Sequence, residues 1–490
     1  MVTSTQKNRF GLNPVFLVTL ILSLAGLLSA PPMEASEKTG GDIMRAVETR
    51  LKNDEGVSAH LIDVKIKDGV VILSGTADSI PAKDRATEVA ETVKGVVSVV
   101  NRVDIRTADR PDAKVRSDIV RRLRENPATK TADISAVVND GTVTLGGEVP
   151  SGADKRLAEG MAKNVRGVSS VYNQIEVVRK DNRSPEAVQK DIEARYAWDV
   201  RLNRENIDVT VKNGTVLLSG IVGSPVLKRR AVDKAWIIGV DEVDPENLKV
   251  DPAALDQRVG KKRREVSDEA ITQAIRKAFQ YDPGTRQADP EIYVEDGVVR
   301  LDGYVDTLQV RTTMDDIARN TVGVISVRND VRIEPGMIET PDPMVDQDHR
   351  LAEKVRAVLQ SDPYIPQDQI AVEVNQGGVG LKGTVDSRFI RERATDVVSE
   401  LAGTLIIENK LRVRDQRKKK EDWKIREDVT DELMWSPFVS GEEITVLVDD
   451  GVVTLKGEVN DLEERRIATK NAMDGGARKV RNLLEVRRPE

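Results

Sequence analysis

The sequence predicts an α/β (α+β) protein made of tandem repeats of a small α-β-β-α-β unit, with two helices on one face of a three-stranded sheet. Three features of the 490 residues lead to this fold class. A turn dipeptide followed six residues later by glycine occurs six times, apolar residues alternate around each turn, and segments of helical periodicity flank each hairpin. Each element has one apolar face to bury, which packing of helices on a sheet achieves.

The first element of each repeat is a helix with apolar residues four positions apart. Ile43, Val47 and Leu51 show this spacing in the first copy. Residues at i, i+4 and i+8 form a narrow apolar stripe along one helical face. The sequence therefore predicts an amphipathic helix before every hairpin.

The hairpin comes next and is centred on a dipeptide that ends in glycine. In the first copy this dipeptide is Asp68-Gly69, a type that supplies the positive φ angles of a tight two-residue turn. Val71 and Leu73 alternate with less apolar residues after the turn, as in a strand with one buried face. The glycines that close the motif are Gly75, Gly147, Gly220, Gly303, Gly383 and Gly457. Glycine near a strand end usually permits a bend or a close approach, so we expect these six to be structural.

A second helix and a third strand complete the unit. The helix is rich in small residues such as Ala86 and Ala90, and a glycine, Gly95 in the first copy, ends it. Five copies have an asparagine six residues later, such as Asn101, which we expect to bond to nearby backbone groups. The third copy has Asp244-Pro245 there, which predicts an edge or irregular strand because proline has no N–H to donate.

Six domains follow from this pattern, joined by short charged linkers. They span residues 41–106, 113–178, 184–250, 266–333, 347–413 and 421–487 and are called repeats 1 to 6. A unit of about 60 residues is only marginally stable alone. We therefore expect neighbouring copies to pack in pairs, although the sequence leaves the pairing order open.

Residues 1–35 are predicted to be a signal peptide or an N-terminal anchor. Lys7 and Arg9 precede an uncharged run of 16 residues, 15–30, which is shorter than the roughly 20 residues of a bilayer span. Cleavage after Ala30 is disfavoured by the proline that follows it. The expected location is the periplasm, either after cleavage or with an uncleaved segment holding the chain at the inner membrane.

Composition excludes several kinds of protein. The chain has no cysteine, two histidines and 3% aromatic residues, which excludes disulfide scaffolds, thiolate metal sites and cysteine nucleophiles. Its net charge of −7 argues against a nucleic-acid partner, which normally requires a basic excess. His60 and His349 lie at non-equivalent positions, and no H-E-x-x-H, G-x-S-x-G or P-loop motif is present. We expect no enzyme activity, no catalytic residues, no cofactor and no metal.

The order of a valine-rich strand, Asp-Gly, V-x-L-x-G, a helix and then G-V-x-x-V-x-N resembles the BON domain family. These motifs run from Gly41 to Val486 in six copies. The resemblance implies an α/β fold with the same order of elements, a location in the bacterial envelope and a non-enzymatic role. It also implies phospholipid binding, protection of the envelope under stress, or chaperoning of exported proteins. Without a lipidated cysteine, the chain is more similar to the soluble, osmotically inducible periplasmic members than to the lipoproteins.

Four aromatic residues near the ends of first helices are candidates for contact with lipid or an unfolded client. Tyr196 and Trp198 occupy this place in repeat 3, and Trp435 and Phe438 occupy it in repeat 6. Amphipathic rings favour the membrane interface. The alternative is that these rings cover the open end of a small core.

Three basic runs, 228–230, 261–264 and 417–420, are further candidates for lipid contact. Such clusters attract anionic headgroups by about 1 kcal/mol for each base near the surface. Solvated linker charge is the alternative explanation for these runs.

The functional hypothesis is an exported protein whose six weak modules bind anionic phospholipid surfaces, or exported and outer-membrane proteins. Linked weak sites gain avidity from their high effective concentration. The alternative is a structural spacer or protein-interaction scaffold in the periplasm without a ligand of its own. Salt-sensitive binding to lipid would favour the first hypothesis, and a defined protein partner would favour the second.

Overall fold

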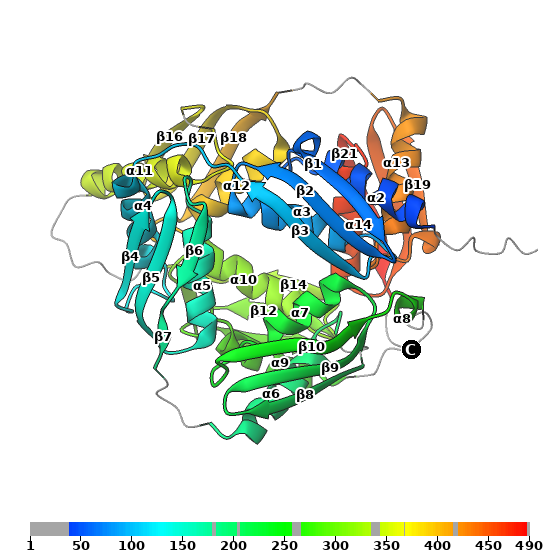
Figure 1. The fold of residues 1–490 in the computed structure, drawn as a ribbon, viewed down its shortest axis with the longest axis horizontal. Helices are drawn as coiled ribbons and strands as arrows, with labels where there is room; N and C mark the ends of the chain where they lie inside the picture. The colour runs from blue at the N-terminus through cyan, green and yellow to red at the C-terminus, as the bar shows by residue number, and fades with distance from the viewer. Residues whose placement is uncertain are drawn as a thin grey trace, which may run out of the picture. The chain divides into compact units, whose positions relative to one another are not determined.

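Every repeat folds as an α-β-β-α-β unit in the computed structural model, as the sequence predicts (Figure 1). The structure describes residues 39–178, 183–202, 206–256, 266–334, 344–366, 368–414 and 420–487. Repeat 1 contains α2 (Gly40–Asn53), a 3-10 turn η2 (Ala59–Leu61), β1 (Ile62–Lys67), β2 (Val70–Ala77), α3 (Ile80–Glu91) and β3 (Ser98–Ile105).

The other repeats keep this order, with small variations in the third strand. Repeat 2 contains α4 (Asp112–Glu125), β4 (Ile134–Asn139), β5 (Thr142–Val149), α5 (Gly152–Lys163), β6 (Ser170–Asn173) and β7 (Glu176–Val177). Repeat 3 contains α6 (Pro185–Trp198), β8 (Asn206–Lys212), β9 (Thr215–Val222), α7 (Pro225–Ala235) and β10 (Glu242–Val250), followed by α8 (Ala253–Asp256). Repeat 4 contains α9 (Asp268–Tyr281), β11 (Glu291–Glu295), β12 (Val298–Asp302), β13 (Tyr304–Val305), α10 (Leu308–Arg319), β14 (Ser326–Asn329) and β15 (Arg332–Ile333). Repeat 5 contains α11 (Met344–Ser361), β16 (Ile370–Asn375), β17 (Gly378–Val385), α12 (Arg388–Ser399) and β18 (Ile406–Val413). Repeat 6 contains α13 (Asp422–Trp435), η3 (Gly441–Glu443), β19 (Ile444–Asp449), β20 (Val452–Val459), α14 (Leu462–Asp474) and β21 (Lys479–Val486).

The central strand of each sheet is the second strand of the repeat. In repeat 1, β1 pairs with β2 in antiparallel fashion, with Val64 opposite Leu73, and β3 pairs with β2 in parallel, with Asn101 opposite Leu73. A parallel pair needs a crossover connection, which α3 supplies. The two helices of the repeat lie on the same face of its sheet (Figure 1).

The turn and the closing glycine have the backbone geometry that the pattern predicts. Asp68 and Gly69 have φ values of 49° and 74°, which are typical of a two-residue hairpin turn. Gly75 has φ 117°, and a Cβ atom at that position would lie 2.0 Å from the carbonyl oxygen of Leu61. This glycine therefore allows close backbone approach, and all six closing glycines have positive φ, a conformation that favours glycine.

The asparagine of the third strand ties that strand to the second helix. The Asn101 Nδ2 donates to the carbonyl of Lys83 at 2.8 Å, and its Oδ1 accepts from the N–H of Val103 at 3.0 Å. The predicted irregularity of repeat 3 is also present, because the register of β10 shifts between Asp244 and Asn247.

The second helix of each repeat begins with a polar capping residue. The cap side chain accepts the N–H of the residue three positions later, which satisfies one of the free donors of the first helical turn. The six capping residues are Ser79, Ser151, Ser224, Thr307, Ser387 and Asp461.

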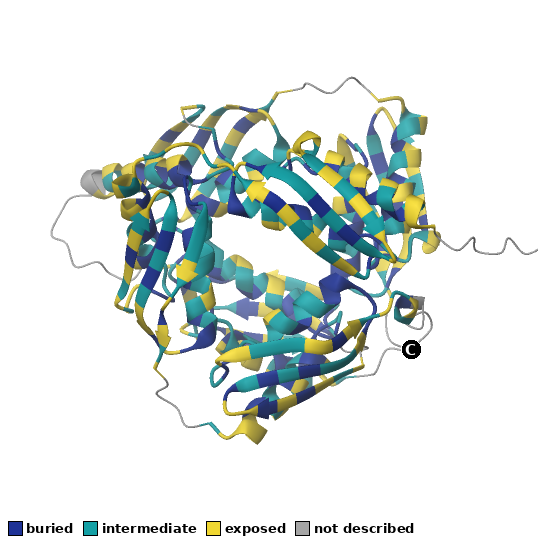
Figure 2. Cartoon of the chain, viewed as in Figure 1, coloured by how far each residue is buried: buried dark blue, intermediate teal, exposed yellow. Residues whose placement is uncertain are grey.

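Each repeat has its own aliphatic core between its helices and its sheet. Buried and exposed residues alternate along the strands (Figure 2). In repeat 1 the predicted helical stripe of Ile43, Val47 and Leu51 is fully part of this core, together with Val71 and Leu73. The described part of the chain contains six such clusters of buried residues, one centred on each repeat.

Residues Gly40–Glu490 form one compact unit, within which the repeats pair in a nested order: 1 with 6, 2 with 5, and 3 with 4. Each pair contains an equivalent main-chain hydrogen bond, in which the N–H before a helix-ending glycine donates to the last carbonyl of the partner's first helix. These bonds join Lys94 N to Trp435 O at 3.0 Å, Arg166 N to Ser361 O at 2.7 Å, and Val322 N to Trp198 O at 2.9 Å. Carbonyls at a helix C-terminus lack partners within the helix, so this contact satisfies one of them. The expectation that sequence neighbours pair holds only for repeats 3 and 4.

Candidate functional site

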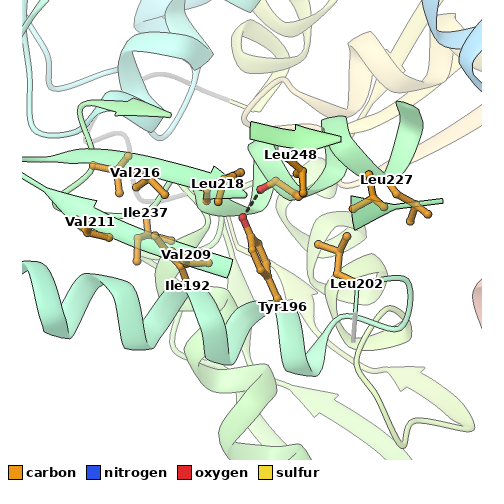
Figure 3. Packing of buried hydrophobic residues seen from close by; sticks show 14 of the residues in the cluster. Ile192, Tyr196, Leu202, Val209, Val211, Val216, Leu218, Leu227, Ile237 and Leu248 are labelled. Carbon is orange, nitrogen blue, oxygen red and sulfur yellow. Dashed lines mark hydrogen bonds between the residues drawn. The ribbon is translucent and has the colours of Figure 1, made fainter. Parts of the chain in front are cut away.

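The aromatic candidates of repeat 3 lie in the last turn of α6 rather than in an open loop. Tyr196 is 5% exposed, and its hydroxyl donates to the carbonyl of Ala231 at 2.7 Å inside the core of repeat 3 (Figure 3). Burial is the main cause that raises its pKa above the ordinary value. Trp198 packs against the core of the paired repeat 4. Packing, the alternative interpretation, describes both residues in this structure.

The candidates of repeat 6 also occupy contacts between repeats. Trp435 is the last residue of α13 and packs against the core of repeat 1. Phe438 packs against the cores of repeats 6 and 3, and the guanidinium of Arg201 lies 4.5 Å from its ring centroid. Arg201 also forms an ion pair with Glu463 of repeat 6. A lipid or client contact through these rings would therefore require the contacts between repeats to open.

Two of the three bases in the run 228–230 form ion pairs within the protein. Arg229 lies 3.0 Å from Glu91 of repeat 1, and Arg230 lies 2.7 Å from Asp199 of its own repeat. Run 261–264 lies outside the described residues, as do 417–419 of the third run. The remaining base of that run, Lys420, lies 2.8 Å from Asp428.

One helical position differs systematically between the two members of each pair. It immediately precedes the last apolar residue of the stripe on the first helix. It is arginine in repeats 1, 2 and 3, as Arg50, Arg122 and Arg195. The equivalent residues in their respective partners are Glu432, Val358 and Ala278. The paired repeats thus differ at this position, with a cation in one member of each pair and a carboxylate, a valine or an alanine in the other.

Between repeats 1 and 6 the cation has a carboxylate partner. The Nε of Arg50 lies 3.0 Å from Oε2 of Glu432, and the two side chains are 9% and 6% exposed. Asn53 donates to the other carboxylate oxygen at 3.0 Å. Burial lowers the pKa of Arg50 and raises that of Glu432, and in each case it outweighs the opposing attraction of the partner.

Between repeats 2 and 5 the cation is compensated less directly. The Nη2 of Arg122 lies 3.8 Å from Oδ2 of Asp362, whose closer partner is Arg393 at 2.8 Å. Burial lowers the pKa of Arg122, and the nearby Glu400 and Asp362 oppose this shift. Arg166 of repeat 2 also donates to the carbonyl of Asp362 at 2.7 Å.

Between repeats 3 and 4 the cation borders a pocket of about 240 Å³. Arg195 and Trp198 line one side of it, and Ala274, Ala278 and Tyr281 line the other. The pocket thus lies between α6 and α9, the first helices of the two repeats. A second pocket, between repeats 1 and 6, is lined by both Arg50 and Glu432 and is more polar in its lining residues.

The outer faces of the sheets form a different kind of surface, which our choice of site residues missed. At one equivalent first-strand position, repeats 2, 4 and 6 expose the apolar or aromatic residues Val137, Tyr293 and Leu447. Repeats 1, 3 and 5 have Lys65, Thr210 and Glu373 there. Strand alternation was the available signal, because these positions lie beside the predicted core residues.

Repeat 4 has the most aromatic of these outer faces. Tyr293 and Tyr304 are 53% and 54% exposed. Tyr293 stands opposite Arg300 in the register, and Tyr304 stands opposite Arg332. The two guanidinium groups lie 5.9 and 5.0 Å from the respective ring centroids.

Within the described ranges, no helix is long and apolar enough to cross a membrane. The same residues contain no group of three or more His, Cys, Asp or Glu side chains arranged to hold a metal ion. The predicted signal peptide or anchor falls on residues 1–35, which lie outside the described part of the chain.

Known proteins resemble this chain over segments of about two repeats. Osmotically-inducible protein Y of Escherichia coli (strain K12) is 31% identical over 140 residues, which cover 27% of this chain and 70% of that protein. The 21 kDa hemolysin of Actinobacillus pleuropneumoniae is 30% identical over 126 residues, covering 24% of this chain and 63% of that protein. The outer membrane lipoprotein DolP of Haemophilus influenzae is 31% identical over 131 residues, covering 24% of this chain and 67% of that protein.

The family comparison covers most of the chain. The BON domain model matches residues 40–107, 111–179, 185–252, 267–335, 347–415 and 421–488. The predicted resemblance is thus confirmed in all six copies, and the chain belongs to the BON domain family.

Proposed function

We propose that the chain is a non-enzymatic protein of the bacterial envelope that binds anionic phospholipid surfaces through the outer faces of its sheets. The single observation that carries the proposal is the exposed apolar or aromatic residue at the same position of repeats 2, 4 and 6. The relatives support the envelope location, since one of them is named an outer membrane lipoprotein.

The outer face of repeat 4 has the chemistry of an interfacial surface. Tyrosine rings favour the boundary between headgroups and acyl chains, and arginines near the surface attract anionic lipids. Arg300 and Arg328 are paired with Asp330 at 3.2 and 2.8 Å, but these pairs are exposed. Exposed ion pairs contribute about 1 kcal/mol or less, so lipid phosphates can replace the carboxylates.

Vesicle co-sedimentation tests the proposal. The protein used comprises residues 39–490, which include the whole compact unit. It is mixed with vesicles that contain phosphatidylglycerol, or with pure phosphatidylcholine vesicles, at low and at high salt. We expect pelleting with the anionic vesicles at low salt only, because salt screens attraction between exposed charges. Absence of pelleting under all four conditions would refute the proposal and favour the scaffold hypothesis.

The tyrosines of repeat 4 provide the matched variants. Partial burial of one ring is worth about 1 kcal/mol, so loss of both rings in Tyr293→Ser with Tyr304→Ser should weaken vesicle affinity by about thirtyfold. The double Phe variant keeps the rings and should retain affinity. Equal binding by the Ser and Phe variants would exclude this face. An exported-protein client is the other possible ligand, and suppression of client aggregation without any vesicle binding would favour it.

A further inference from the structure

The interface between repeats 3 and 4 contains a cation without the carboxylate that its equivalent has elsewhere. Arg50 meets Glu432 at 3.0 Å in the interface between repeats 1 and 6. At the position equivalent to Glu432, repeat 4 has Ala278, and the space left by the shorter side chain is part of the pocket that Arg195 also lines. The internal repetition of the chain thus shows which chemical group this pocket lacks.

Arg195 is held in place by main-chain carbonyls, and Asp282 and Asp199 attract it without pairing with it. Its Nη1 donates to the carbonyls of Lys234 and Trp236 at 3.0 and 3.3 Å, whereas its buried Nε has no hydrogen-bond partner. It forms an ion pair with none of the carboxylates in the described ranges. Two main-chain carbonyls therefore orient a guanidinium that keeps a free donor.

A second cation lines the same pocket. The Nζ of Lys234 lies 3.9 Å from Oδ2 of Asp199, which is beyond hydrogen-bonding distance. Asp199 is already engaged by Arg230, whose Nε and Nη2 donate to its carboxylate at 2.8 and 2.7 Å. Asp199, which also lines the pocket, is thus shared among cations, and Asp282 attracts Lys234 as well. The lining residues still include three cations, Arg195, Lys234 and Lys277, and one carboxylate, so the pocket has excess positive charge.

Apolar surface predominates in the rest of the pocket. It comes from Ala274, Ala278, Ile317 and Trp198, and the lining also includes the polar residues Gln273, Asn320 and Thr321. The volume of about 240 Å³ exceeds the roughly 150 Å³ of an apolar cavity that admits benzene. A small organic body can therefore enter beside the cations.

We propose that this pocket binds a monocarboxylate with a short aliphatic chain, that is, a medium-chain fatty acid anion. The carboxylate meets Arg195 and Lys234, as Glu432 meets Arg50 in the other interface, and the chain lies along the alanines of α9 and the ring of Trp198. A charged group is retained in a partly apolar site only when it is paired. The ligand would contact both repeats 3 and 4 inside their interface. Binding in this pocket does not depend on lipid binding by the outer sheet faces.

Calorimetric titration of the full chain with octanoate tests this proposal, with octanol as the uncharged ligand of equal length. We expect one saturable octanoate site and at least tenfold weaker binding of octanol. Arg195→Gln should weaken the affinity for octanoate by at least tenfold, because the guanidinium that pairs with the carboxylate is lost. Equal affinity for octanoate and octanol, or no saturable site, would overturn the proposal.

Two variants of Ala278 separate loss of the site from loss of the fold. Ala278→Glu should abolish octanoate binding and raise the melting temperature, since the new carboxylate pairs with Arg195 as Glu432 does with Arg50. Ala278→Leu should abolish binding by filling the pocket, without the additional ion pair. If octanoate still bound to both folded variants at its original affinity, the site would lie elsewhere and the proposal would be wrong.

Discussion

The interface between repeats 1 and 6 and the interface between repeats 3 and 4 contain an arginine at the same helical position, buried in the first and half-buried in the second, and its charge has different partners in the two. Arg50 has Glu432 beside it, with both side chains less than a tenth exposed. Arg195 has two carbonyls, an apolar pocket and a neighbouring lysine. The comparison shows that pairing of repeats does not require this ion pair, since both interfaces keep the same main-chain hydrogen bond.

The arginine–glutamate pair therefore contributes more to the choice of partner repeat than to net stability. Desolvation of two buried charges often offsets their attraction, and the pKa directions of Arg50 and Glu432 both show burial as the larger effect. We infer that Glu432 distinguishes repeat 6 from repeats 4 and 5 as the partner of repeat 1, because the equivalent residues Ala278 and Val358 carry no charge that could pair with Arg50.

The largest effect in this comparison is expected from Glu432→Ala. This variant places an alanine beside Arg50, as Ala278 is the equivalent residue in the interface that contains Arg195. The variant leaves Arg50 buried without a carboxylate and removes the acceptor of Asn53. Loss of one member of a buried pair costs about 3–5 kcal/mol, so the free energy of unfolding measured in urea should fall by that amount.

Glu427→Ala is the matched control for this variant. Glu427 lies on the same helix, is 53% exposed and pairs with Lys424 at the surface. Its loss should change the free energy of unfolding by no more than about 0.5 kcal/mol. A similar loss of stability in the two variants would contradict the importance of the buried pair.

The repeat itself was predictable because its elements depend on local signals. The turn at Asp68-Gly69, the close approach at Gly75 and the helical stripe at Val47 each follow from residues a few positions apart, and the structure contains all three. The irregular strand at Pro245 followed from the missing N–H of proline in the same way.

The pairing of repeats and the role of the aromatic rings could not be predicted in the same way. Glu432 contacts Arg50, which is 382 residues away in the chain, and nothing local to either residue indicates the other. The sequence marks Trp198 and Trp435 as candidates for lipid contact, since it does not reveal that they pack against the cores of other repeats. Alignment of the six first helices did contain one usable signal, namely arginine in the first three copies and none in the last three at this position.

A smaller effect is expected from Lys234→Met, which removes the second cation of the interface between repeats 3 and 4. Burial and the nearby Arg195 lower the pKa of Lys234 to about 8. The groups that act on it are Arg195 from α6, Asp199 at the end of α6, Arg230 from α7 and Asp282 after α9. Protonation of Lys234 therefore opposes folding.

The sign of the pH dependence follows from this lowered pKa. At pH 7 the lysine is protonated in both the folded and unfolded states, so the variant should be about 1–2 kcal/mol more stable. As the pH rises from 8 to 10.5, Lys234 loses its proton in the folded wild-type protein before it does so in the unfolded chain. The stability of the wild type therefore approaches that of the variant. Urea unfolding of both proteins at pH 7 and pH 10.5 measures the gap, and a gap that widened at high pH would refute the assignment.

The smallest effect on stability is expected when both members of the buried pair are replaced together. Replacement of a buried ion pair by apolar residues of similar volume is often neutral or stabilising, so Arg50→Met with Glu432→Leu should unfold within about 1 kcal/mol of the wild type. The double variant thus sharpens the comparison, since it gives repeats 1 and 6 an apolar contact where repeats 3 and 4 have a cation beside a pocket. If it lost as much stability as Glu432→Ala alone, the ion pair would contribute net stability rather than partner matching. A double variant that remains stable but gives mixed pairing, detected by engineered cysteine cross-links between repeats 1 and 6, would assign the pair to specificity.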